Sequence, residues 1–421
     1  MCAVSTNKGD FTGKKLLVLG ANKESIPLIK RAREMGIYTI ATDHLKNSPA
    51  KIEADKAFDI DGRDVKSLKY MAEKERIDGI ILGAADPLVP SYVELCDLMN
   101  MPCYVKKDNL NFFTDKKVFK DVLNSVDIPT LPSLFYGNFL DKPVSWVYPV
   151  IVKPAVSRGG ANVFLCNNFM ETHKALPLAA QSSDNGKALV EPYTDMEDVS
   201  IYYIVCDGKP IFLSMADHKI LRRKENISPV TYGNLFPSKR TSIFLKDYHN
   251  RIVRLCNKLN IHDGIFTMQA FVDEQTFYPY DPSAIISGII SNNVCKRTHG
   301  FDALGALIKY AFTGSMGNVF EPQLSDEIPF MEEIWILLCP GKIAKIEGLV
   351  ELNNESHVLY CMDRLHEGDV VPEKFYQTEK SALARIWIAA DKAENLERLS
   401  SKIRSEIRAY DENGKDMIYS I

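Results

Sequence analysis

A lysine stands at the end of an apolar run that should form a buried strand, in the stretch YPVIVKPAVSRGGANVFL at residues 148–165. An ammonium group at the end of a buried strand is costly unless an anion or an acceptor neutralises it. The loop that follows carries Gly159 and Gly160, whose backbone amides have no β-carbon beside them and can donate several hydrogen bonds to a polyphosphate. Lys153 and this loop therefore favour a nucleotide site, although a structural lysine beside an ordinary hairpin would explain them equally well.

Two glutamates flank a short connection further along the chain, in KALVEPYTDMEDVSIYYIV at residues 187–205. A carboxylate accepts bidentate hydrogen bonds, so Glu191 and Glu197 could hold the exocyclic amine of a purine and the hydroxyls of a ribose. A solvated acidic loop is the alternative, and the two glutamates taken alone favour that alternative.

A third stretch, at residues 264–288, reads as two strands joined near DEQ. This hairpin would bring Gln269 and Asp281 side by side on adjacent strands. Oxygen ligands in that arrangement suit Mg²⁺, which typically takes one or two carboxylates and leaves its other positions to phosphate and water. The sequence therefore predicts a magnesium site on this hairpin.

The bulk composition is that of a folded protein with several domains. At ~100 to 200 residues per domain, a chain of 421 residues forms about three. Apolar residues make up 46% and charged residues 25%, which excludes a disordered or fibrous chain. The net charge is −4, so no global basic field exists to attract nucleic acid or anionic lipid. Nucleic acid is not expected as a partner.

The nine cysteines are scattered, and none has CxxC spacing. This pattern fits reduced thiols, and it implies neither a disulfide framework nor a structural zinc site. The N-terminal segment lacks the apolar core of a secretory signal, and no run approaches the ~18 apolar residues that a membrane span needs. We therefore expect a cytoplasmic protein without a membrane partner.

The N-terminal part of the chain alternates between apolar runs of strand length and amphipathic segments of helix length. Strands are predicted at 15–20, 37–43 and 77–83, with a helix at 65–75 between the last two. Such alternation is typical of a parallel sheet covered on both faces, in a Rossmann-like unit. The turn GANKES after the first strand lacks the second and third glycines of GxGxxG, so it gives little support for a dinucleotide site.

The remaining regions mix strands and helices. A helix begins near Thr114, which could cap it, and the segment IPTLP ends it because proline cannot continue a helix. The DGK turn at 207–209 predicts a hairpin, and helices are predicted at 248–261 and 303–312. In the tail, a second hairpin is expected about PGK at 340–342. The fold class is therefore α/β and α+β.

In combination and in this order, these stretches resemble the ATP-grasp superfamily over nearly the whole chain. DKKVFKDVLNSVDIPTLPS is similar to its DK(x)nL(x)nGIPxP segment, YPVIVKPAVSRGGANV to YPVxVKPxxxxGGxGV, and ALVEPYTDMEDVSI to xLVEExxxGxEYSV. RTHGFDALGALIKYAFTG is similar to GxDxLxxLIxxAxxG, which follows the metal strand. The C-terminal unit resembles that of the branch containing carbamoyl phosphate synthetase and phosphoribosylaminoimidazole carboxylase.

The resemblance implies three domains. A Rossmann-like domain would span 1–113, an ATP-grasp domain 114–325, and a small C-terminal α+β domain 326–421. Within the ATP-grasp domain, two α+β subdomains clamp ATP, and the smaller one, the lid, would span about 133–192.

The resemblance also implies which residues bind ATP. Two lysines would hold the α and β phosphates, and the glycine loop would close over the β and γ phosphates. The first glutamate, with the backbone after it, would bind adenine, and the second would bind the ribose. The phosphate lysines are Lys116 and Lys153, and the glycine loop contributes Ser157, Gly159, Gly160 and Ala161. The adenine contacts are Glu191, Pro192 and Thr194, and the ribose contact is Glu197.

The metal strand departs from the family's ExNxR pattern. In its place stands DPSAI, so that Asp281 replaces the glutamate, Ser283 the asparagine and Ile285 the arginine. Gln269, Asp281 and Ser283 remain the predicted metal ligands, although Gln269 stands where many members have a glutamate. With fewer carboxylates, the binding of a second Mg²⁺ should be weaker. The loss of the arginine removes a cation that would neutralise the γ phosphate. The basic residues that could substitute for it are Arg222, Arg223, Lys296 and Arg297.

The resemblance implies an ATP- and Mg²⁺-dependent carboxylate-amine ligase. The γ phosphate passes to a substrate carboxylate, and an amine then displaces phosphate from the acyl phosphate to form an amide. Such catalysis depends on positioning and neutralisation, so no Ser/His/Asp or Cys/His arrangement is required, and none is evident. The partners would be a small-molecule carboxylate and an amine, whose identities stay open. The oligomeric state is open too, and a homodimer is one assembly that the resemblance allows.

Two other interpretations stay open. The protein could be a nucleotide-binding homologue that has lost ligase activity and acts in regulation, for which the altered metal strand is the only support. A Rossmann dehydrogenase is the other, but it rests on GANKES alone and leaves the remaining stretches unexplained.

Overall fold

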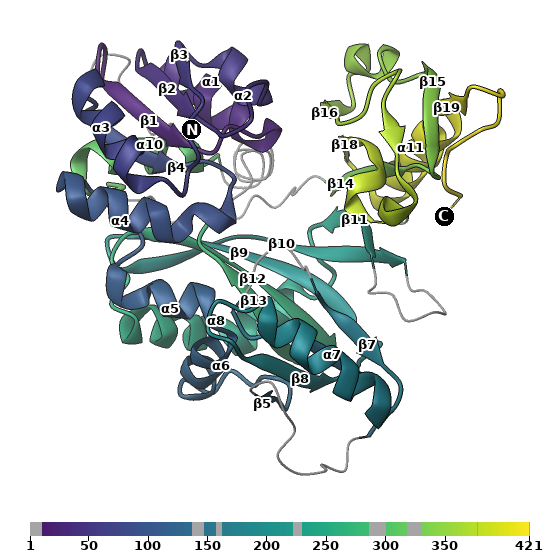
Figure 1. Cartoon of the computed structure of the whole chain (residues 1–421), viewed down its shortest axis with the longest axis horizontal. Coiled ribbons are helices and arrows are strands. Elements are labelled where there is room, and N and C mark those ends of the chain that lie inside the picture. Colours follow the sequence, from purple (N-terminus) through teal and green to yellow (C-terminus); the bar gives the residue numbers. More distant parts are fainter. Residues whose placement is uncertain are drawn as a thin grey trace. The chain divides into compact units, whose positions relative to one another are not determined.

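The structure, a computed structural model, describes residues 11–136, 147–156, 162–221, 230–285, 300–317, 330–376 and 378–420 (Figure 1). The chain divides into two compact units. Unit 1 consists of Met1–Met196, Ile201–Ser214 and Ser242–Leu324. Unit 2 consists of Glu197–Ser200, Met215–Thr241 and Ser325–Ile421. None of the helices that the structure describes is long and apolar enough to cross a membrane.

Unit 1 begins with a four-stranded parallel sheet, as the alternating pattern predicts. Its strands are β1 (Lys15–Leu19), β2 (Tyr38–Thr42), β3 (Lys56–Phe58) and β4 (Gly79–Leu82), in the order β3-β2-β1-β4 (Figure 1). The order reverses between β1 and β4, and ligands of open parallel sheets bind outside the carboxyl ends of strands at such a switch point. The segment after β4, which begins with Gly83, therefore lies at a position suited to binding.

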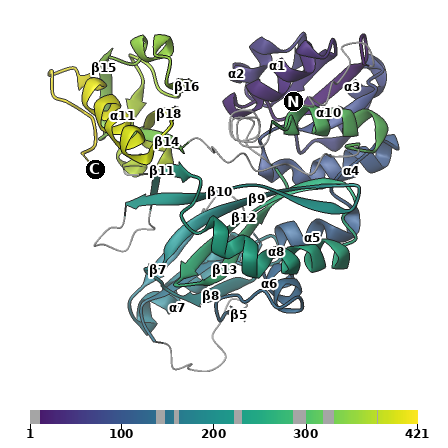
Figure 2. The same ribbon diagram turned by 180° about the vertical axis from the view of Figure 1, so that it is seen from behind.

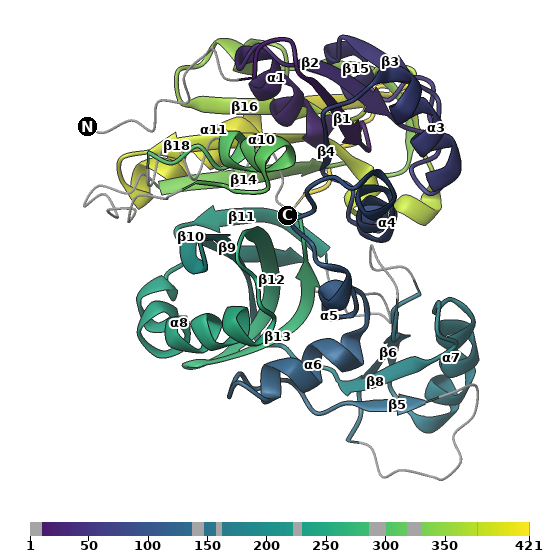
Figure 3. The same ribbon diagram turned by 90° about the vertical axis from the view of Figure 1, so that its left-hand side faces the viewer.

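Helices connect and cover these strands. They are η1 (Lys23–Ser25), α1 (Ile26–Glu34), α2 (Pro49–Glu53), α3 (Val65–Glu75), η2 (Asp86–Leu88), α4 (Val89–Met99), η3 (Lys107–Asn109) and α5 (Leu110–Thr114). Helix α10 (Ala303–Thr313), distant in the sequence, packs against β4 and α1 (Figure 3). Arg31 of α1 forms an ion pair of 2.6 Å with Asp302, which also caps α10. The late helix is thereby tied to the first sheet.

The GANKES turn has a structural explanation. Gly20 has a φ of +84°, and a Cβ atom there would lie 2.6 Å from the Cβ of Ala85. Glycine is therefore required both by its backbone conformation and by the close approach of the loop after β4. Asn22 accepts a hydrogen bond from the Ser25 amide and so begins η1.

A second, antiparallel sheet occupies the segment predicted as the lid. Its strands are β5 (Leu134–Tyr136), β6 (Val150–Pro154), β7 (Phe164–Cys166) and β8 (Ala188–Pro192), in the order β5-β8-β6-β7. Helix α7 (Phe169–Gln181) packs against β6 (Figure 3). Val150, Val152 and Val190 form a core with the apolar face of this helix.

Helix α6 (Lys116–Asn124) precedes the lid, and the prediction that Thr114 caps it is wrong. Thr114 is the last residue of α5, and the side chain of Asp115 accepts hydrogen bonds from the amides of Lys117 and Val118. A carboxylate at this position also interacts favourably with the positive end of the helix dipole.

The rest of unit 1 is built on long strands. These are β9 (Glu197–Cys206), β10 (Lys209–Leu221), β12 (Gly264–Asp273) and β13 (Thr276–Ser283), in the order β13-β12-β9-β10, and β9 and β10 continue into unit 2. Asp207 and Gly208, both with positive φ, join β9 to β10, as the DGK turn predicts. Helix α8 (Thr241–Lys258) lies beside the sheet that contains β12 and β13 (Figure 2). Its Phe244 packs against Phe277 of β13, with ring centroids 5.1 Å apart.

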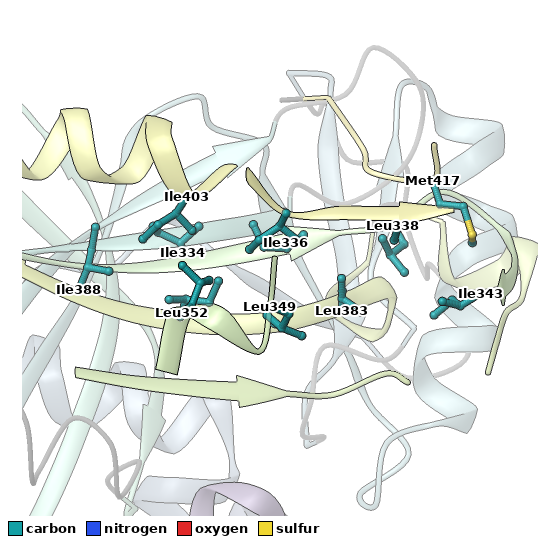
Figure 4. Close-up of a cluster of buried hydrophobic side chains, with 14 of the residues drawn as sticks. Ile334, Ile336, Leu338, Ile343, Leu349, Leu352, Leu383, Ile388, Ile403 and Met417 are labelled. Carbon is teal, nitrogen blue, oxygen red and sulfur yellow. The ribbon is translucent and has the colours of Figure 1, made fainter. Parts of the chain in front are cut away.

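Unit 2 contains a larger and a smaller sheet. The larger continues β10 through β11 (Val230–Phe236), β14 (Phe330–Leu337), β18 (Ala382–Ala390) and β16 (Val358–Asp363) in that order. The smaller has the order β17 (Val370–Val371), β15 (Gly341–Glu347), β19 (Arg408–Asp411). Helix α11 (Ala393–Glu406) contacts β14 and β18. Three short 3-10 helices complete the described part of this unit: η5 (Glu351–Asn354), η6 (Glu373–Phe375) and η7 (Glu379–Ser381). Figure 4 shows the isoleucine-rich core between these elements.

The predicted hairpin about PGK is wrong. Strand β14 pairs with β11 on one edge and with β18 on the other, so it has no edge left for β15. Strand β15 instead pairs with β17 and β19. Gly341 has a φ of +150°, which allows the chain to leave one sheet and enter the other. The same turn residues would also suit a hairpin, so the local sequence cannot distinguish the two connections.

Candidate nucleotide-binding site

The buried carboxylate of Glu191 is the centre of a cluster of charges in unit 1. Lys153 lies with its Nζ 2.6 Å from Glu191 Oε2, and Lys120 forms an ion pair with Oε1. Ser133 donates a hydrogen bond of 3.0 Å to the same Oε1. Both carboxylate oxygens are therefore engaged by protein donors.

Strand register brings Lys153 to Glu191. In the antiparallel pair of β6 and β8, Lys153 is opposite Leu189, and Ile151 is opposite Glu191. Side chains two residues apart on a strand share a face, so Lys153 and Glu191 are diagonal neighbours on one face of the sheet. The Glu191 carboxylate therefore neutralises Lys153, the lysine that ends the apolar run.

Helix α6 supplies two further lysines from its buried face. Its buried residues are Lys116, Phe119, Lys120 and Leu123, spaced i, i+3, i+4, i+7 as on the core-facing stripe of a helix. Lys120 donates to the carbonyl oxygen of Leu131 at 2.9 Å and to the hydroxyl of Ser133 at 2.5 Å. Lys120 was not predicted as a site residue. The sequence could have indicated Lys120, because it stands at an apolar position of an amphipathic helix, where a lysine needs a buried acceptor.

The cluster carries an excess of buried positive charge. Lys116, Lys120 and Lys153 are each less than a tenth exposed, and Glu191 is the buried carboxylate among them. Burial lowers the pKa of Lys116 and of Lys120, an effect partly offset by Asp281 for Lys116 and by Glu191 for Lys120. Burial alone would raise the pKa of Glu191, but Lys153 and Lys120 together lower it to about 2. Such an excess favours an anionic ligand.

The depressed pKa of Glu191 predicts a pH-dependent contribution to stability. Because its pKa falls from the ordinary 4.5 to about 2, the carboxylate stabilises the fold above pH 4.5, and this stabilisation is lost as the pH falls towards 2. A difference of that size corresponds to about 3 kcal/mol. In urea titrations from pH 6 to pH 3, we expect the free energy of unfolding of Glu191→Gln to lie below that of the wild type at pH 6. The gap should narrow below pH 4.5, whereas a constant gap would contradict the assignment.

An aromatic pair connects the lysine cluster to the strands predicted to bind metal. The ammonium of Lys153 lies 5.7 Å from the ring centroid of Tyr280 on β13, and Tyr280 stacks on Phe271 at 4.4 Å. Cation–π contacts of this kind orient an ammonium without neutralising it. Asp281 follows Tyr280 directly, so Lys153 and the predicted metal strand lie close together.

The two strands predicted to bind metal bring Gln269 and Asp281 together as expected. Gln269 of β12 is directly opposite Asp281 of β13, beside a bulge. Asp281 lines one small cavity together with Lys116 and Asp86. Ser283 lies two residues further along, and its hydroxyl donates a hydrogen bond of 2.7 Å to Asp86. The hairpin therefore presents one carboxylate and one carboxamide side by side, with a hydroxyl nearby that is already engaged.

This donor set fits a single Mg²⁺. The ion takes oxygen ligands, and one or two protein groups suffice when phosphate and water fill the other positions. Asp281 and Gln269 can supply those two groups. Among the described residues, no group of three or more His, Cys, Asp or Glu side chains could hold a metal by itself. A metal here would thus depend on a phosphate-bearing ligand.

The remaining predicted adenosine contacts are placed as follows. Pro192 is the last residue of β8, and the hydroxyl of Thr194 accepts a hydrogen bond from the Met196 amide at 3.1 Å. Glu197 belongs to unit 2, where it pairs with Lys239 at 2.5 Å and with Arg240 at 2.7 Å. Burial would raise the pKa of Glu197, but these two cations outweigh it and lower the pKa. A ribose at Glu197 would have to share its carboxylate with them.

Several predicted residues lie outside the described part of the chain. They are Ser157, Gly159, Gly160 and Ala161 of the glycine loop, and the basic candidates Arg222, Arg223, Lys296 and Arg297. Their roles stay predictions.

Unit 2 contains a buried Ser–His–Asp contact. The hydroxyl of Ser200 lies 2.7 Å from Nε2 of His218, and Nδ1 of His218 lies 3.5 Å from Asp198. All three side chains are buried, and 3.5 Å is too long for a well-formed hydrogen bond to the carboxylate. This arrangement is not that of an exposed nucleophile, and the ligase chemistry implied by the motifs does not need one.

Comparison with known proteins relates the chain to a group of enzymes. No protein-family model matches the sequence. The chain is 24% identical over 286 residues to the formate-dependent phosphoribosylglycinamide formyltransferase of Mannheimia succiniciproducens, covering 66% of this chain and 71% of that protein. It is 26% identical over 327 residues to the carbamoyl phosphate synthase large chain of Clostridium perfringens, covering 69% of this chain and 29% of that one. In four other formyltransferases, the match spans about half of the relative's length.

Solved structures share the fold. The L-amino acid ligase from Bacillus licheniformis matches with a TM-score of 0.78 at 16% identity, over 96% of this chain and all of that one. A biotin carboxylase from Campylobacter jejuni, solved as a complex with a β,γ-ATP compound, matches with a TM-score of 0.71 at 17% identity, over 96% and 92% of the two chains. The fold and the resemblance to the ATP-grasp superfamily predicted from the motifs are confirmed.

Proposed function

We propose that this protein is an ATP-dependent ligase that joins a carboxylate to an amine through an acyl phosphate and releases ADP and phosphate. The single observation that carries the proposal is the cluster of three buried lysines around one buried glutamate, next to the Gln269–Asp281 pair. An excess of buried positive charge beside a carboxylate suits the triphosphate of a nucleotide bound with Mg²⁺. The relationship to ATP-grasp enzymes supports the same ligand.

Each residue of the cluster would have a distinct role. Lys153 and Lys116 would neutralise the α and β phosphates, while Glu191 keeps the Lys153 ammonium fixed at the end of β6. Lys120 and Ser133 would hold Glu191 in turn, so the geometry is set before the nucleotide arrives. Positioning and charge neutralisation account for most catalysis in phosphoryl transfer.

The metal would be held by Asp281 and Gln269. Held by these two residues, Mg²⁺ would supply positive charge that offsets the negative charge of the triphosphate during phosphoryl transfer. The reaction then balances in two steps. A carboxylate oxygen attacks the γ phosphorus as the bond to ADP breaks, and an amine nitrogen attacks the acyl carbon as phosphate leaves and the nitrogen loses a proton.

The carboxylate and amine would bind near the carboxyl ends of β1 and β4. This position is the switch point of the parallel sheet, where open α/β sheets bind their ligands. Asp86, just after β4, faces the cavity that also contains Lys116 and Asp281, so this edge of the sheet adjoins the proposed phosphate site. A substrate held there would present its carboxylate towards the γ phosphate.

A second candidate function is nucleotide binding without ligation. One observation favours it: the metal hairpin offers a single carboxylate at the Gln269–Asp281 pair, and Ile285 stands where the ExNxR pattern has arginine. Such a protein would bind ATP and release no phosphate in response to substrates.

Two measurements separate the candidates. In a thermal shift assay, ATP with Mg²⁺ should raise the melting temperature and NAD should not, because ligands that bind the folded state stabilise it. Phosphate release should then be measured with formate or L-amino acids as carboxylates, and with amines or amino acids as acceptors, singly and in pairs. Release that requires both substrates supports the ligase, whereas binding without release across the panel supports the second candidate. A shift with NAD alone would contradict both.

A further inference from the structure

One face of the larger sheet of unit 2 carries buried polar side chains that the proposed ligase chemistry does not use. Asn234 of β11 is directly opposite Glu333 of β14, and Glu333 is opposite Trp387 of β18. Residues opposite each other across an antiparallel pair share a face, as do residues two apart on one strand. Trp335 of β14 and its cross-strand partner Arg385 therefore lie on the same face. We call these five residues the tryptophan face.

Helix α11 covers the other face of this sheet. Glu332, which precedes Glu333 on β14, accepts a hydrogen bond of 3.0 Å from Ser400 of α11. Ile334 and Ile336 belong to the apolar core that this helix helps to form (Figure 4). The tryptophan face is thus directed away from α11, and this helix cannot supply partners for its polar atoms.

Three polar atoms of the tryptophan face are buried without a hydrogen bond. They are Oδ1 of Asn234 and the indole Nε1 atoms of Trp335 and Trp387, which have no hydrogen-bond partner in the part of the chain that the structure describes. Each of these side chains is less than a tenth exposed. Because buried polar groups are nearly always hydrogen-bonded, unpaired atoms on neighbouring strands indicate a polar molecule that binds there.

The charges beside these atoms indicate which groups that molecule carries. Nδ2 of Asn234 donates to Glu333, so the unpaired Oδ1 is an acceptor next to a carboxylate and suits an ammonium group. The guanidinium of Arg385 lies 4.8 Å from the ring centroid of Trp335, so the unpaired indole N–H is a donor next to a cation and suits a carboxylate. Glu333 and Arg385 form an ion pair, so their charges cancel and favour a ligand without net charge.

The spacing of these groups suits a small ligand. Asn234 and Trp335 are diagonal neighbours on adjacent antiparallel strands, and the Cα atoms of such neighbours are about 7–8 Å apart. Two hydrogen bonds of about 3 Å each, with the backbone atoms of a single amino acid between them, span that distance. Trp387 is the diagonal neighbour of Trp335 on the next strand, so its N–H can serve the same carboxylate.

We propose that the tryptophan face binds an α-amino acid as its zwitterion. The ammonium group would donate to Asn234, and the carboxylate would accept from the indole N–H groups of Trp335 and Trp387. These residues belong to unit 2, whereas the lysine cluster and the Gln269–Asp281 pair belong to unit 1. Binding of an amino acid at this face therefore does not depend on the proposed ligase chemistry, and it can be measured without nucleotide.

The indole signals of the protein report on this face directly. The chain has three tryptophans, so the full chain labelled with ¹⁵N-tryptophan gives three indole N–H signals in NMR spectra, which single Trp→Phe variants assign. Each common L-amino acid should be titrated separately. We expect at least one of them to move the Trp335 and Trp387 signals together and saturably. The corresponding amine without the carboxylate, and the corresponding acid without the ammonium, should bind at least ~10-fold more weakly, because each leaves buried atoms unpaired.

Two variants test the proposed contacts. Trp335→Phe keeps a ring beside Arg385 but removes the donor, so the dissociation constant measured from the Trp387 signal should rise at least ~10-fold. Ser400→Ala is the matched control, because it removes a hydrogen bond on the α11 side of the same sheet and should bind the amino acid like the wild type.

Two results would overturn the proposal. In the first, no amino acid moves either signal and the indole N–H groups exchange magnetisation with ordered water only. In the second, Trp335→Phe binds the amino acid as tightly as Ser400→Ala. If Trp335→Phe fails to fold, the wild-type titrations with the amino acid, the amine and the acid decide the matter.

Discussion

Replacing Lys153 by methionine should lower the affinity for ATP at least ~100-fold, which corresponds to about 3 kcal/mol. The substitution removes a buried cation that faces the proposed phosphate site and leaves Glu191 with Lys120 as its remaining ion-pair partner among the described contacts. A charge-assisted contact to phosphate is lost, and a carboxylate with less compensation now repels the ligand. Isothermal titration calorimetry of ATP with Mg²⁺ against both proteins measures the effect.

Two controls separate binding from folding in this experiment. Lys117 is exposed on α6 beside the buried Lys116 and pairs with Asp121, so Lys117→Met changes the same charge without touching the cluster and should bind ATP like the wild type. The double variant Lys153→Met/Glu191→Gln leaves the buried Lys120 without Glu191 as its ion-pair partner, so its stability should fall below that of Lys153→Met, and it should not recover affinity because the Lys153 cation is still absent. If Lys153→Met bound ATP as tightly as Lys117→Met, the phosphate site would have to be elsewhere.

Replacing Asp281 by asparagine should reduce substrate-dependent phosphate release by at least ~100-fold. Asp281 is the carboxylate of the opposed pair on the metal hairpin, and its partner Gln269 is uncharged. The hold on Mg²⁺ depends on ligand charge, so asparagine leaves two neutral oxygens in a region of buried lysines. Phosphate release should be measured at saturating ATP over a range of Mg²⁺ concentrations, because a weakened metal site shows as a higher Mg²⁺ requirement.

The reciprocal variant Gln269→Glu provides the matched test. It places a second carboxylate opposite Asp281 and should lower the Mg²⁺ concentration for half-maximal activity by roughly tenfold, about 1.4 kcal/mol. Opposite shifts from the two variants would identify the hairpin as the metal site. Unchanged Mg²⁺ dependence in both would exclude it. For a protein that only binds nucleotide, the same opposite shifts should appear in Mg²⁺-dependent ATP affinity, with no phosphate release in any variant.

The sequence by itself determined those features that depend on local periodicity. The alternation of apolar runs specified the parallel sheet, because strands and helices differ in the spacing of their buried residues. The sequence also predicted that Gln269 and Asp281 lie side by side, but it did not show the bulge that pairs them: without the register shift between Gln269 and Ala270, the turn would place Gln269 opposite Tyr280. Lys153 was conspicuous for a related reason: a charge inside an apolar run must have a partner.

The tertiary structure decided which partners those charges have. Lys120 and Lys153 share Glu191 because helix α6 and strands β6 and β8 pack together, and no local spacing relates these three elements. The failed PGK hairpin has the same origin, since the turn residues fit a hairpin but both edges of β14 were already occupied by β11 and β18. Short-range pattern fixes the elements, whereas pairing of edges and burial of charge are settled by packing between segments that are distant along the chain.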